Sequence, residues 1–239
     1  MQSLNLTLPT PAENLALDEA LLEEAEQAGR PRETLRLWEP AEPLVVVGRS
    51  SRIDAEVHRD FCRRRGIPIL RRSSGGAAVV TGPGCLMYAL VLSYARRPRL
   101  RMIDHAHRFV LGRIASALRP LVPGVTCRGT SDLALDRRKF SGNSVRAKRD
   151  HFLYHGTLLY DFPLELVDRC LKPPPRQPEY RQGRSHAEFV TNVPLSAAQI
   201  RQALVAAWDA EATRGEWPGP QTARLAAERY GRREWSERR

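Results

Sequence analysis

The residue types best suited to chemistry are gathered in one stretch, Arg71–Val80, which reads Arg-Arg-Ser-Ser-Gly-Gly-Ala-Ala-Val-Val. Glycine lets the backbone approach a ligand closely, and exposed backbone N–H groups can surround an anion. Arginine adds a bidentate partner for a phosphate or a carboxylate. The same stretch also suits a hairpin in which Ser-Gly-Gly only makes the turn. It therefore indicates either an anion site or a plain connection between two strands.

A lysine supplies a second candidate group. The chain has only three lysines, Lys139, Lys148 and Lys172, among 38 basic residues. Lys139 precedes Ser141–Asn143, a second polar stretch with a glycine, which we expect to be a loop between strands. A lysine ammonium can place a point charge on a carbonyl or phosphate oxygen, although an isolated hairpin lysine is more often simply solvated. The scarcity of lysine and the two similar stretches favour one anion site lined by Arg72 and Lys139.

Apolar runs on either side of these stretches predict the strands that position them. Ile67–Leu70 and Leu86–Leu92 flank the glycine stretch, and Asp132–Asp136 and Phe152–Tyr160 flank Lys139. Strands that follow one another through hairpins form antiparallel pairs, unlike the strands of a βαβ dinucleotide fold. We therefore expect an α+β protein with a largely antiparallel sheet.

The N-terminal third predicts two helices and a strand pair. Asn14–Ala28 is amphipathic, and we expect Asn14 to be its N-cap and its acidic residues to be solvated. Thr34–Trp38 and Leu44–Gly48 are expected to pair with each other across a proline-containing turn. Ile53–Arg65 is expected to be a single helix.

Composition limits the class of protein. A length of 239 residues with 42% hydrophobic residues suits one large domain, and the net charge of +11 favours an acidic partner. The sequence has no leader or membrane-spanning pattern, so we expect a cytoplasmic protein with no membrane partner. Much of the charge comes from an arginine excess, and we expect no nucleic-acid partner. The cysteines are too widely spaced for a zinc site or a disulfide framework: Cys62, Cys85, Cys127 and Cys170.

Taken together, these motifs resemble the lipoate–protein ligase A family and the wider superfamily of biotin/lipoate protein ligases and octanoyltransferases. The family pattern Arg-Arg-x-Ser-Gly-Gly-Gly-Ala-Val matches Arg71–Val79, with Ala77 in place of the third glycine. Five further segments are similar to family segments in the same order: Asn14–Glu19, Leu37–Arg49, Asp132–Gly142, His155–Leu159 and Val190–Val193. The resemblance covers nearly the whole chain.

The resemblance implies an α+β (α/β) fold with a mixed, largely antiparallel central sheet flanked by helices. This is the biotin/lipoate protein ligase catalytic-domain fold, which is similar to that of class II aminoacyl-tRNA synthetases. It implies one catalytic domain, residues 1–239, with no C-terminal accessory domain. The implied enzyme adenylates lipoate or octanoate with ATP and Mg²⁺. It then passes the acyl group to a lysine of a lipoyl carrier domain, in a 2-oxoacid dehydrogenase E2 or a glycine cleavage H-type protein. The need for a separate accessory protein is left open.

Residue roles follow from the resemblance by position. Lys139 would be catalytic, contacting both the acyl carboxylate and the α-phosphate, and Asp132 would approach Mg²⁺ or the nucleotide. The implied ATP or adenylate site comprises Arg72, Ala77, Ala78, Val79, Val80, Asp132 and Lys139. The implied acyl or lipoate site comprises Ser74, Gly75, Gly76, Lys139, Gly142, His155 and Gly156.

Departures from the family pattern keep other functions open. Family ligases usually continue with His-Asp-x-Gly-Asn, where this chain has Thr81–Cys85. Octanoyltransferases use a cysteine thiolate near a lysine, and Cys127 or Cys85 would be that nucleophile here. Both thiols also suit small buried hydrophobic residues. A third class, a non-catalytic module that binds a ligand or nucleic acid, would agree with the basic charge.

Overall fold

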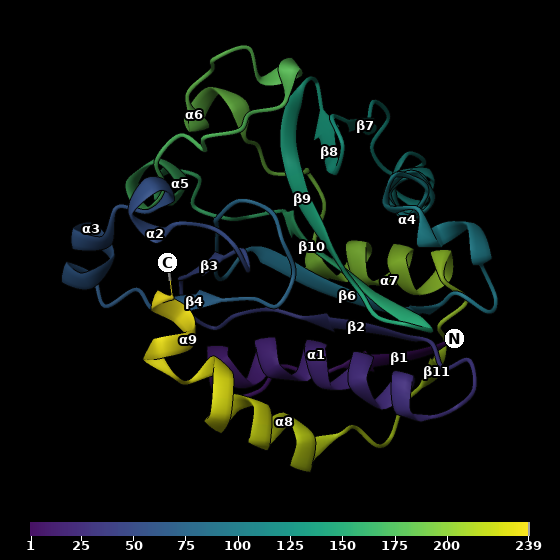
Figure 1. Ribbon diagram of the computed structural model, residues 1–239. Helices are drawn as coiled ribbons and strands as arrows, with labels where there is room; N and C mark the ends of the chain where they lie inside the picture. Colours follow the sequence, from purple (N-terminus) through teal and green to yellow (C-terminus); the bar gives the residue numbers. More distant parts are fainter. Residues whose placement is uncertain (239) are drawn as a thin grey trace.

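The computed structural model describes residues 1–238, and its centre is an eight-stranded sheet (Figure 1). The strand order is β11-β1-β2-β6-β10-β9-β8-β7. β1 runs parallel to β2 and β11, and the other neighbouring pairs are antiparallel. The strands are β1 (Gln2–Asn5), β2 (Thr34–Trp38), β6 (Cys85–Ser93), β7 (Thr126–Arg128), β8 (Asp132–Leu135), β9 (Arg138–Ala147), β10 (His151–Leu159) and β11 (Ala212–Thr213). The expected mixed, largely antiparallel sheet is confirmed.

A second, three-stranded sheet carries the glycine stretch. Its order is β4-β3-β5, where β3 (Leu44–Val47) runs parallel to β4 (Ile69–Arg71) and antiparallel to β5 (Val79–Thr81). The expected pairing of β3 with β2 is therefore wrong, because β2 already has β1 on one edge and β6 on the other. The glycine stretch runs from β4 to β5, a short strand that the sequence analysis missed.

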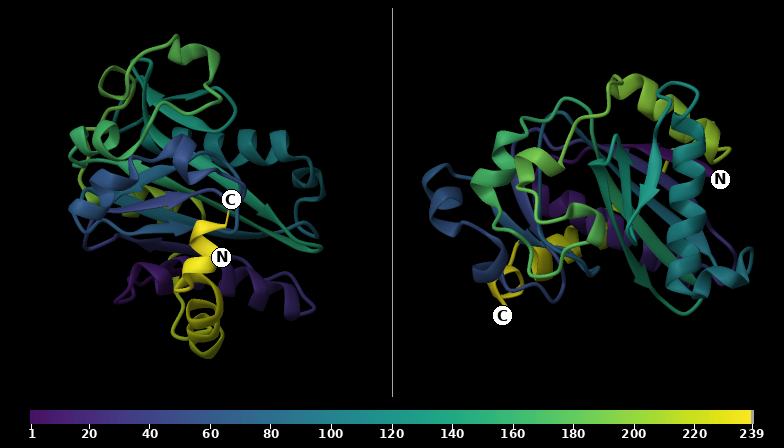
Figure 2. Two further views of the ribbon diagram at one scale, coloured as in Figure 1. Left: turned by 60° about the vertical axis from the view of Figure 1, so that its left-hand side comes forward. Right: turned by 90° about the horizontal axis from the view of Figure 1, so that it is seen from above.

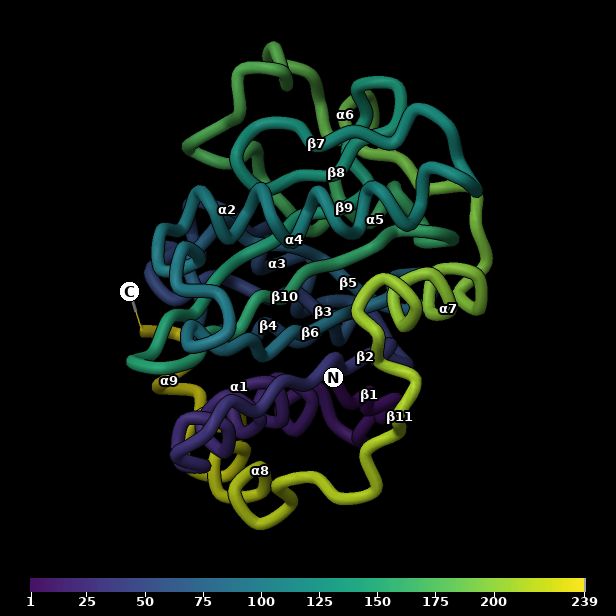
Figure 3. The backbone as a smooth tube through the Cα atoms, turned by 90° about the vertical axis from the view of Figure 1, so that its right-hand side faces the viewer, coloured from purple at the N-terminus to yellow at the C-terminus, as the bar shows by residue number. Residues whose placement is uncertain are grey.

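Helices cover both faces of the large sheet. α4 and α7 pack on one face, α1 packs on the other, and α8 lies along the outer side of α1 (Figures 2 and 3). The helices are α1 (Pro11–Gln27), α2 (Ile53–Glu56), α3 (Arg59–Arg64), α4 (Ile103–Leu118), α5 (Glu165–Cys170), α6 (His186–Phe189), α7 (Ala197–Ala207), α8 (Gly219–Leu225) and α9 (Arg233–Glu237). Three short turns of helix are η1 (Pro98–Arg101), η2 (Glu179–Arg181) and η3 (Ala226–Tyr230). Within residues 1–238, no helix combines the length and the apolar character needed to cross a membrane.

Two of the helix predictions need correction. The single helix expected over residues 53–65 is divided into α2 and α3, because Val57 between them is extended with φ −127° and ψ 139°. The N-cap of α1 is Thr10, whose side chain forms a capping box with Glu13. Asn14 lies inside the helix, where its side-chain oxygen accepts from the Leu8 amide at 2.9 Å.

The side chains of β10 alternate between the two faces of the large sheet, and this decides which of them can reach the second sheet. Phe152 and Tyr154 pack in the core under α4 and α7, whereas Leu153 packs with α1. Successive strand residues point to opposite faces, so His155 and Thr157 lie on the same face as Leu153. The three-stranded sheet lies on that face, and the space between the two sheets is therefore lined by polar residues of β10.

Candidate functional site

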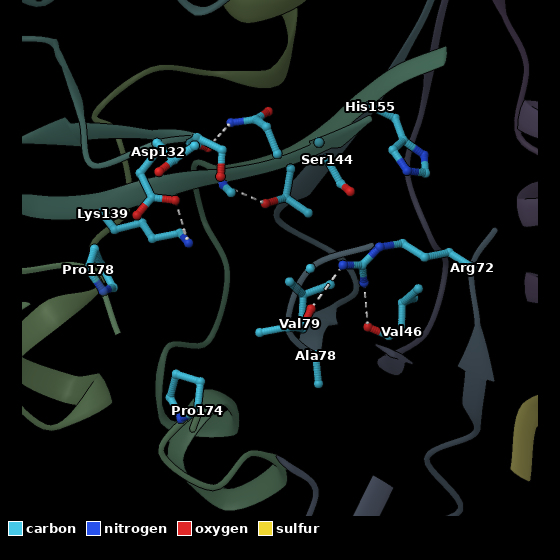
Figure 4. Close-up of a pocket in the computed structure, with 18 of the residues that line it drawn as sticks. Val46, Arg72, Ala78, Val79, Asp132, Lys139, Ser144, His155, Pro174 and Pro178 are labelled. Atoms are coloured by element: carbon cyan, nitrogen blue, oxygen red, sulfur yellow. Dashed lines mark hydrogen bonds and ion pairs between the residues drawn. The ribbon is translucent and has the colours of Figure 1, made fainter. Parts of the chain in front are cut away.

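A cavity of about 380 Å³ lies between the two sheets. In Figure 4, Lys139 and Asp132 lie on one side of it, Arg72 and His155 on the opposite side, and Ala78 and Val79 between them. The predicted site residues that line it are Arg72, Gly76, Ala77, Ala78, Val79, Asp132, Lys139, Gly142, His155 and Gly156. The fold therefore brings the glycine stretch and the lysine-bearing strand to one cavity.

The cavity has one apolar region, and a second apolar space adjoins it. The first, here called the inner arm, is lined by Leu15, Val46 and Met87, which belong to the buried core. The second is an adjoining space of about 120 Å³, here called the outer arm. Lys139 lines both the main cavity and the outer arm. The outer arm adds the following lining residues: Val80, Phe140, Ser141, Leu159, Val167, Leu171, His186 and Val190.

Lys139 points into the cavity from a strand rather than from a loop. The stretch Ser141–Asn143, expected to be a loop, is part of β9. β9 pairs with β8 through a register irregularity, so that Asp132 lies opposite Gly142 while Ala134 lies opposite Lys139. The absence of a side chain at Gly142 makes room for the lysine, because a Cβ there would lie 2.9 Å from Nζ. The irregular register therefore brings the lysine beside an acidic residue of the neighbouring strand.

Asp132 holds the Lys139 ammonium in place. Nζ lies 2.7 Å from Oδ1 of Asp132, and the side chains are 29% and 8% exposed respectively. The other carboxylate oxygen accepts a hydrogen bond from the Tyr180 hydroxyl at 2.8 Å. Burial, followed by the charge of Asp132, raises the pKa of Tyr180, so this phenol remains a donor. The sequence analysis did not single out Tyr180 as a site residue.

Arg72 organises the glycine stretch. Its guanidinium donates to the carbonyls of Val46 at 3.0 Å, Gly75 at 2.6 Å and Ala77 at 3.0 Å. Burial lowers the pKa of Arg72 to about 10, which leaves it charged at neutral pH. These contacts assign Arg72 a structural part in shaping the loop, while its predicted contact with a nucleotide remains a prediction.

The backbone of the glycine stretch is held by residues that the sequence analysis did not single out. The Ala78 amide donates to the Glu56 carboxylate at 2.6 Å, and the Ser51 hydroxyl donates to the Gly76 carbonyl at 3.0 Å. Gly76 has φ +87°, a backbone conformation that favours glycine. Glu56 gave no signal in the sequence, because nothing local to α2 shows which loop it will face.

A buried polar chain connects His155 to α1. Its Nε2 lies 2.6 Å from the Ser74 hydroxyl, and its Nδ1 lies 3.5 Å from Asp18. Asp18 also pairs with Arg36 at 2.6 Å, and both side chains are almost fully buried. The expectation that the acidic residues of α1 are solvated is therefore wrong for Asp18, and also for Glu19, which is 2% exposed. The signal was present in the sequence, because a cation inside a strand as apolar as β2 requires a buried partner.

Two residues of the predicted acyl site lie outside the cavity lining. Ser74 is only 1% exposed and forms part of this buried chain. Gly75 is exposed, and its carbonyl accepts from the Ser144 hydroxyl of β9 at 2.9 Å. Both residues thus connect the glycine stretch to the large sheet.

Neither candidate nucleophile is among the described residues that line the cavity or its outer arm. Cys85 is fully buried, and burial raises its pKa to about 12. Cys127 is exposed on β7, and desolvation raises its pKa as well. A raised pKa lowers the thiolate fraction of each cysteine. Their positions outside the cavity lining and their raised pKa values therefore give the thiol nucleophile no support.

The described residues do not form a ready magnesium site. No group of three His, Cys, Asp or Glu residues suited to a metal ion occurs among residues 1–238. Asp132 stands alone, with one oxygen on Lys139 and the other on Tyr180. The described residues thus offer no complete ligand set for a resident ion, and the predicted approach of Asp132 to Mg²⁺ or the nucleotide stays a prediction.

A lysine-bearing strand of the large sheet and a glycine-rich loop of the second sheet thus face one cavity. The chain belongs to the family described as the lipoyl protein ligase A/B catalytic domain, whose model matches residues 10–208. "Probable lipoate-protein ligase A" of Mycoplasma pneumoniae is 30% identical over 163 residues, 67% of this chain and 46% of that protein. Lipoate-protein ligase LplJ of Bacillus subtilis is 26% identical over 191 residues, 79% of this chain and 54% of that protein. The chain spans about half the length of the curated relatives it matches.

Solved structures confirm the predicted catalytic-domain fold. A bi-partite lipoate protein ligase from Thermoplasma acidophilum, described with its E2 lipoyl domain, superposes with a TM-score of 0.83 at 24% identity, covering 99% of this chain and 96% of that one. A T. acidophilum structure with bound lipoic acid gives 0.80 at 22% identity, covering 99% and 98%. A lipoate-protein ligase A bound with ATP gives 0.80 at 22% identity, covering 99% of each chain.

Proposed function

We propose that the chain adenylates lipoate or octanoate with ATP and transfers the acyl group to a lysine of a lipoyl carrier domain. The observation that carries this proposal is the position of Lys139. Its side chain lines both the main cavity and the outer arm, and residues 77–79 of the glycine stretch line the same two spaces. Membership of the family supports the reaction type. The bound ATP and lipoic acid of similar structures support the choice of substrates.

The two apolar regions suggest how the substrates lie. The aliphatic tail of the acid would occupy the inner arm, beside Leu15, Val46 and Met87. The adenine would occupy the outer arm, where Phe189 offers an aromatic face. The carboxylate and the α-phosphate would then meet at Lys139.

Two chemical steps follow from that arrangement. A carboxylate oxygen attacks the α-phosphorus, and the bond from that phosphorus to pyrophosphate breaks. The Lys139 ammonium stabilises the negative charge on the oxygens during this displacement. The neutral amine of the carrier lysine then attacks the acyl carbon, the bond to AMP breaks, and the amine loses a proton as the amide forms. Mg²⁺, if used, would arrive on the phosphates of the nucleotide, and no step here depends on it.

The proposed partners are proteins that carry the acceptor lysine. A 2-oxoacid dehydrogenase E2 lipoyl domain or a glycine cleavage H-type protein would supply it, and a similar ligase is described with its E2 lipoyl domain. That ligase is also described as bi-partite, which supports a separate accessory protein for this chain.

The test is lipoate-dependent exchange of pyrophosphate into ATP, measured with and without candidate accessory proteins. Lys139→Ala is expected to reduce exchange by about 10²–10³-fold, the usual cost of removing one group that stabilises developing charge. Lys148→Ala is the matched control, because the Lys148 side chain is also 29% exposed and lies 3.5 Å from one carboxylate, that of Glu23. Absence of exchange under every condition, or equal losses in the two variants, would contradict the proposal.

A further inference from the structure

The C-terminal segment, residues 219–237, lies outside the part of the chain that the family model matches. It comprises α8, η3 and α9. The segment runs along the outer side of α1 and then returns to β4, as Figure 1 shows in yellow near the C-terminus. Its last helix therefore contacts the strand from which the glycine stretch departs.

The buried carboxylate of Glu19 anchors this segment to α1. It accepts hydrogen bonds from the Tyr230 hydroxyl at 2.7 Å and from Arg229 at 2.8 Å. Glu19 is 2% exposed and Tyr230 is 1% exposed. Burial and the Glu19 charge raise the pKa of Tyr230 well above its usual value, while a hydrogen bond with the Ser73 side chain opposes the shift. Tyr230 thus connects the C-terminal segment to α1.

A second set of contacts joins α9 to Arg71. The Trp235 indole Nε1 donates to the Arg71 carbonyl at 2.8 Å. The Arg71 side chain, which is fully buried, donates to the Ser236 carbonyl at 3.0 Å. The same guanidinium donates to the carbonyls of Gly48 at 2.7 Å and Ser51 at 2.9 Å. Arg71 therefore ties the C-terminal segment to the turn that follows β3.

The turn after β3 holds the glycine stretch. The Arg49 amide donates to the Ser74 carbonyl at 2.7 Å, and the Ser51 hydroxyl donates to the Gly76 carbonyl at 3.0 Å. The Gly76 carbonyl also packs so closely on Gly48 that a Cβ at Gly48 would lie 1.9 Å from its oxygen. A continuous series of contacts therefore runs from the C-terminal segment to the cavity wall.

We propose that the C-terminal segment positions the glycine stretch for substrate binding and that Trp235 is its principal positioning residue. Among the described residues, none from 219 to 237 lines the cavity or its outer arm, so the segment acts through Arg71 and the turn after β3. The predicted effect on catalysis rests on the proposed function. The predicted effect on the loop does not, because it is measured without substrate.

The direct test is hydrogen–deuterium exchange of the full chain, comparing Trp235→Phe with the wild type. Phenylalanine keeps an aromatic ring and removes the N–H donor. We expect amides of residues 73–79 to exchange roughly fivefold faster, the equivalent of one lost hydrogen bond. Glu234→Ala, an exposed change on the same helix, should leave those amides unchanged. Unaltered protection of residues 73–79 in Trp235→Phe overturns the inference.

A catalytic readout separates positioning from general stability. At a temperature where circular dichroism shows the variant fully folded, Trp235→Phe should raise KM for lipoate or ATP by roughly fivefold while kcat changes less. A purely structural role would leave KM of the folded protein unchanged. If Trp235→Phe does not fold, Tyr230→Phe removes only the hydroxyl bonded to Glu19 and gives the same comparison. Loss of all lipoate-dependent exchange in the wild type counts against the proposed function, whereas the deuterium result decides this inference by itself.

Discussion

Replacement of Gly48 by alanine tests how closely the glycine stretch must be held. An alanine Cβ would lie 1.9 Å from the Gly76 carbonyl oxygen and 3.0 Å from its carbon. Contacts of a Cβ below 3.0 Å are essentially never seen, so the oxygen must move by at least about 1.1 Å. Both neighbours are backbone, so rotation of a side chain cannot relieve the overlap.

The expected magnitude follows from that displacement. Overpacking of this kind costs about 1–3 kcal/mol, and loss of the Ser51 hydrogen bond to the Gly76 carbonyl adds about 1 kcal/mol. We therefore expect Gly48→Ala to lower the free energy of unfolding by about 2–4 kcal/mol. A shift of about 1 Å at a reacting site costs on the order of 100-fold in rate, so lipoate-dependent exchange should fall by about that factor.

The assay combines urea unfolding with ATP–pyrophosphate exchange at a temperature where the variant is folded. Gly112→Ala is the control, because a Cβ at Gly112 in α4 would meet nothing within 4 Å. That change should raise stability by up to about 1 kcal/mol through helix propensity and leave exchange unchanged. If Gly48→Ala keeps its kcat/KM within about twofold of the wild type, the link between loop position and catalysis is refuted.

Three further outcomes are expected. Arg36→Met should lower the free energy of unfolding by about 3–5 kcal/mol in urea titrations, because it leaves the Asp18 carboxylate buried without its cation, and a loss below about 1 kcal/mol would contradict this. Burial lowers the pKa of His107, so the unfolded chain binds a proton at this residue more readily than the folded chain does. The free energy of unfolding should therefore fall as the pH drops below about 6.5. His107→Phe should flatten that dependence in melting curves recorded at a series of pH values. Cys127→Ser and Cys85→Ser should each retain lipoate-dependent exchange, and mass spectrometry after incubation with an octanoyl carrier should find neither thiol acylated; an acyl adduct on either would instead favour the transferase reaction.

Local patterns were sufficient for most of the strands around the site. The run at Leu86–Leu92 lies within β6, and the run at Phe152–Tyr160 overlaps β10 almost completely, because nine consecutive buried residues in each strand leave a strong apolar signal. Lys139 stood out because lysine is rare in this chain, and the structure places it in the cavity. Apolar runs and residue composition can be read from a single sequence without knowledge of the fold.

The partners of buried charges could not be found in this way. Arg36 in an apolar strand required a counter-charge, but only the packing of α1 on the sheet shows that Asp18 provides it. The contact of Glu56 with the Ala78 amide likewise depends on how α2 sits over the second sheet. The same limit explains why Tyr180 was missed, since its connection is irregular and carries no periodic pattern.

By itself, the sequence was sufficient to predict the class of fold and to single out the glycine stretch and Lys139 as candidate site residues. The tertiary structure alone decided that β3 pairs with β4 and β5 and that α9 supports Arg71. The physical reason is that apolar periodicity and turn residues act over a few neighbouring positions. Strand pairing and buried hydrogen bonds instead join residues far apart in the chain, and their choice depends on which edges and donors the rest of the fold has already used.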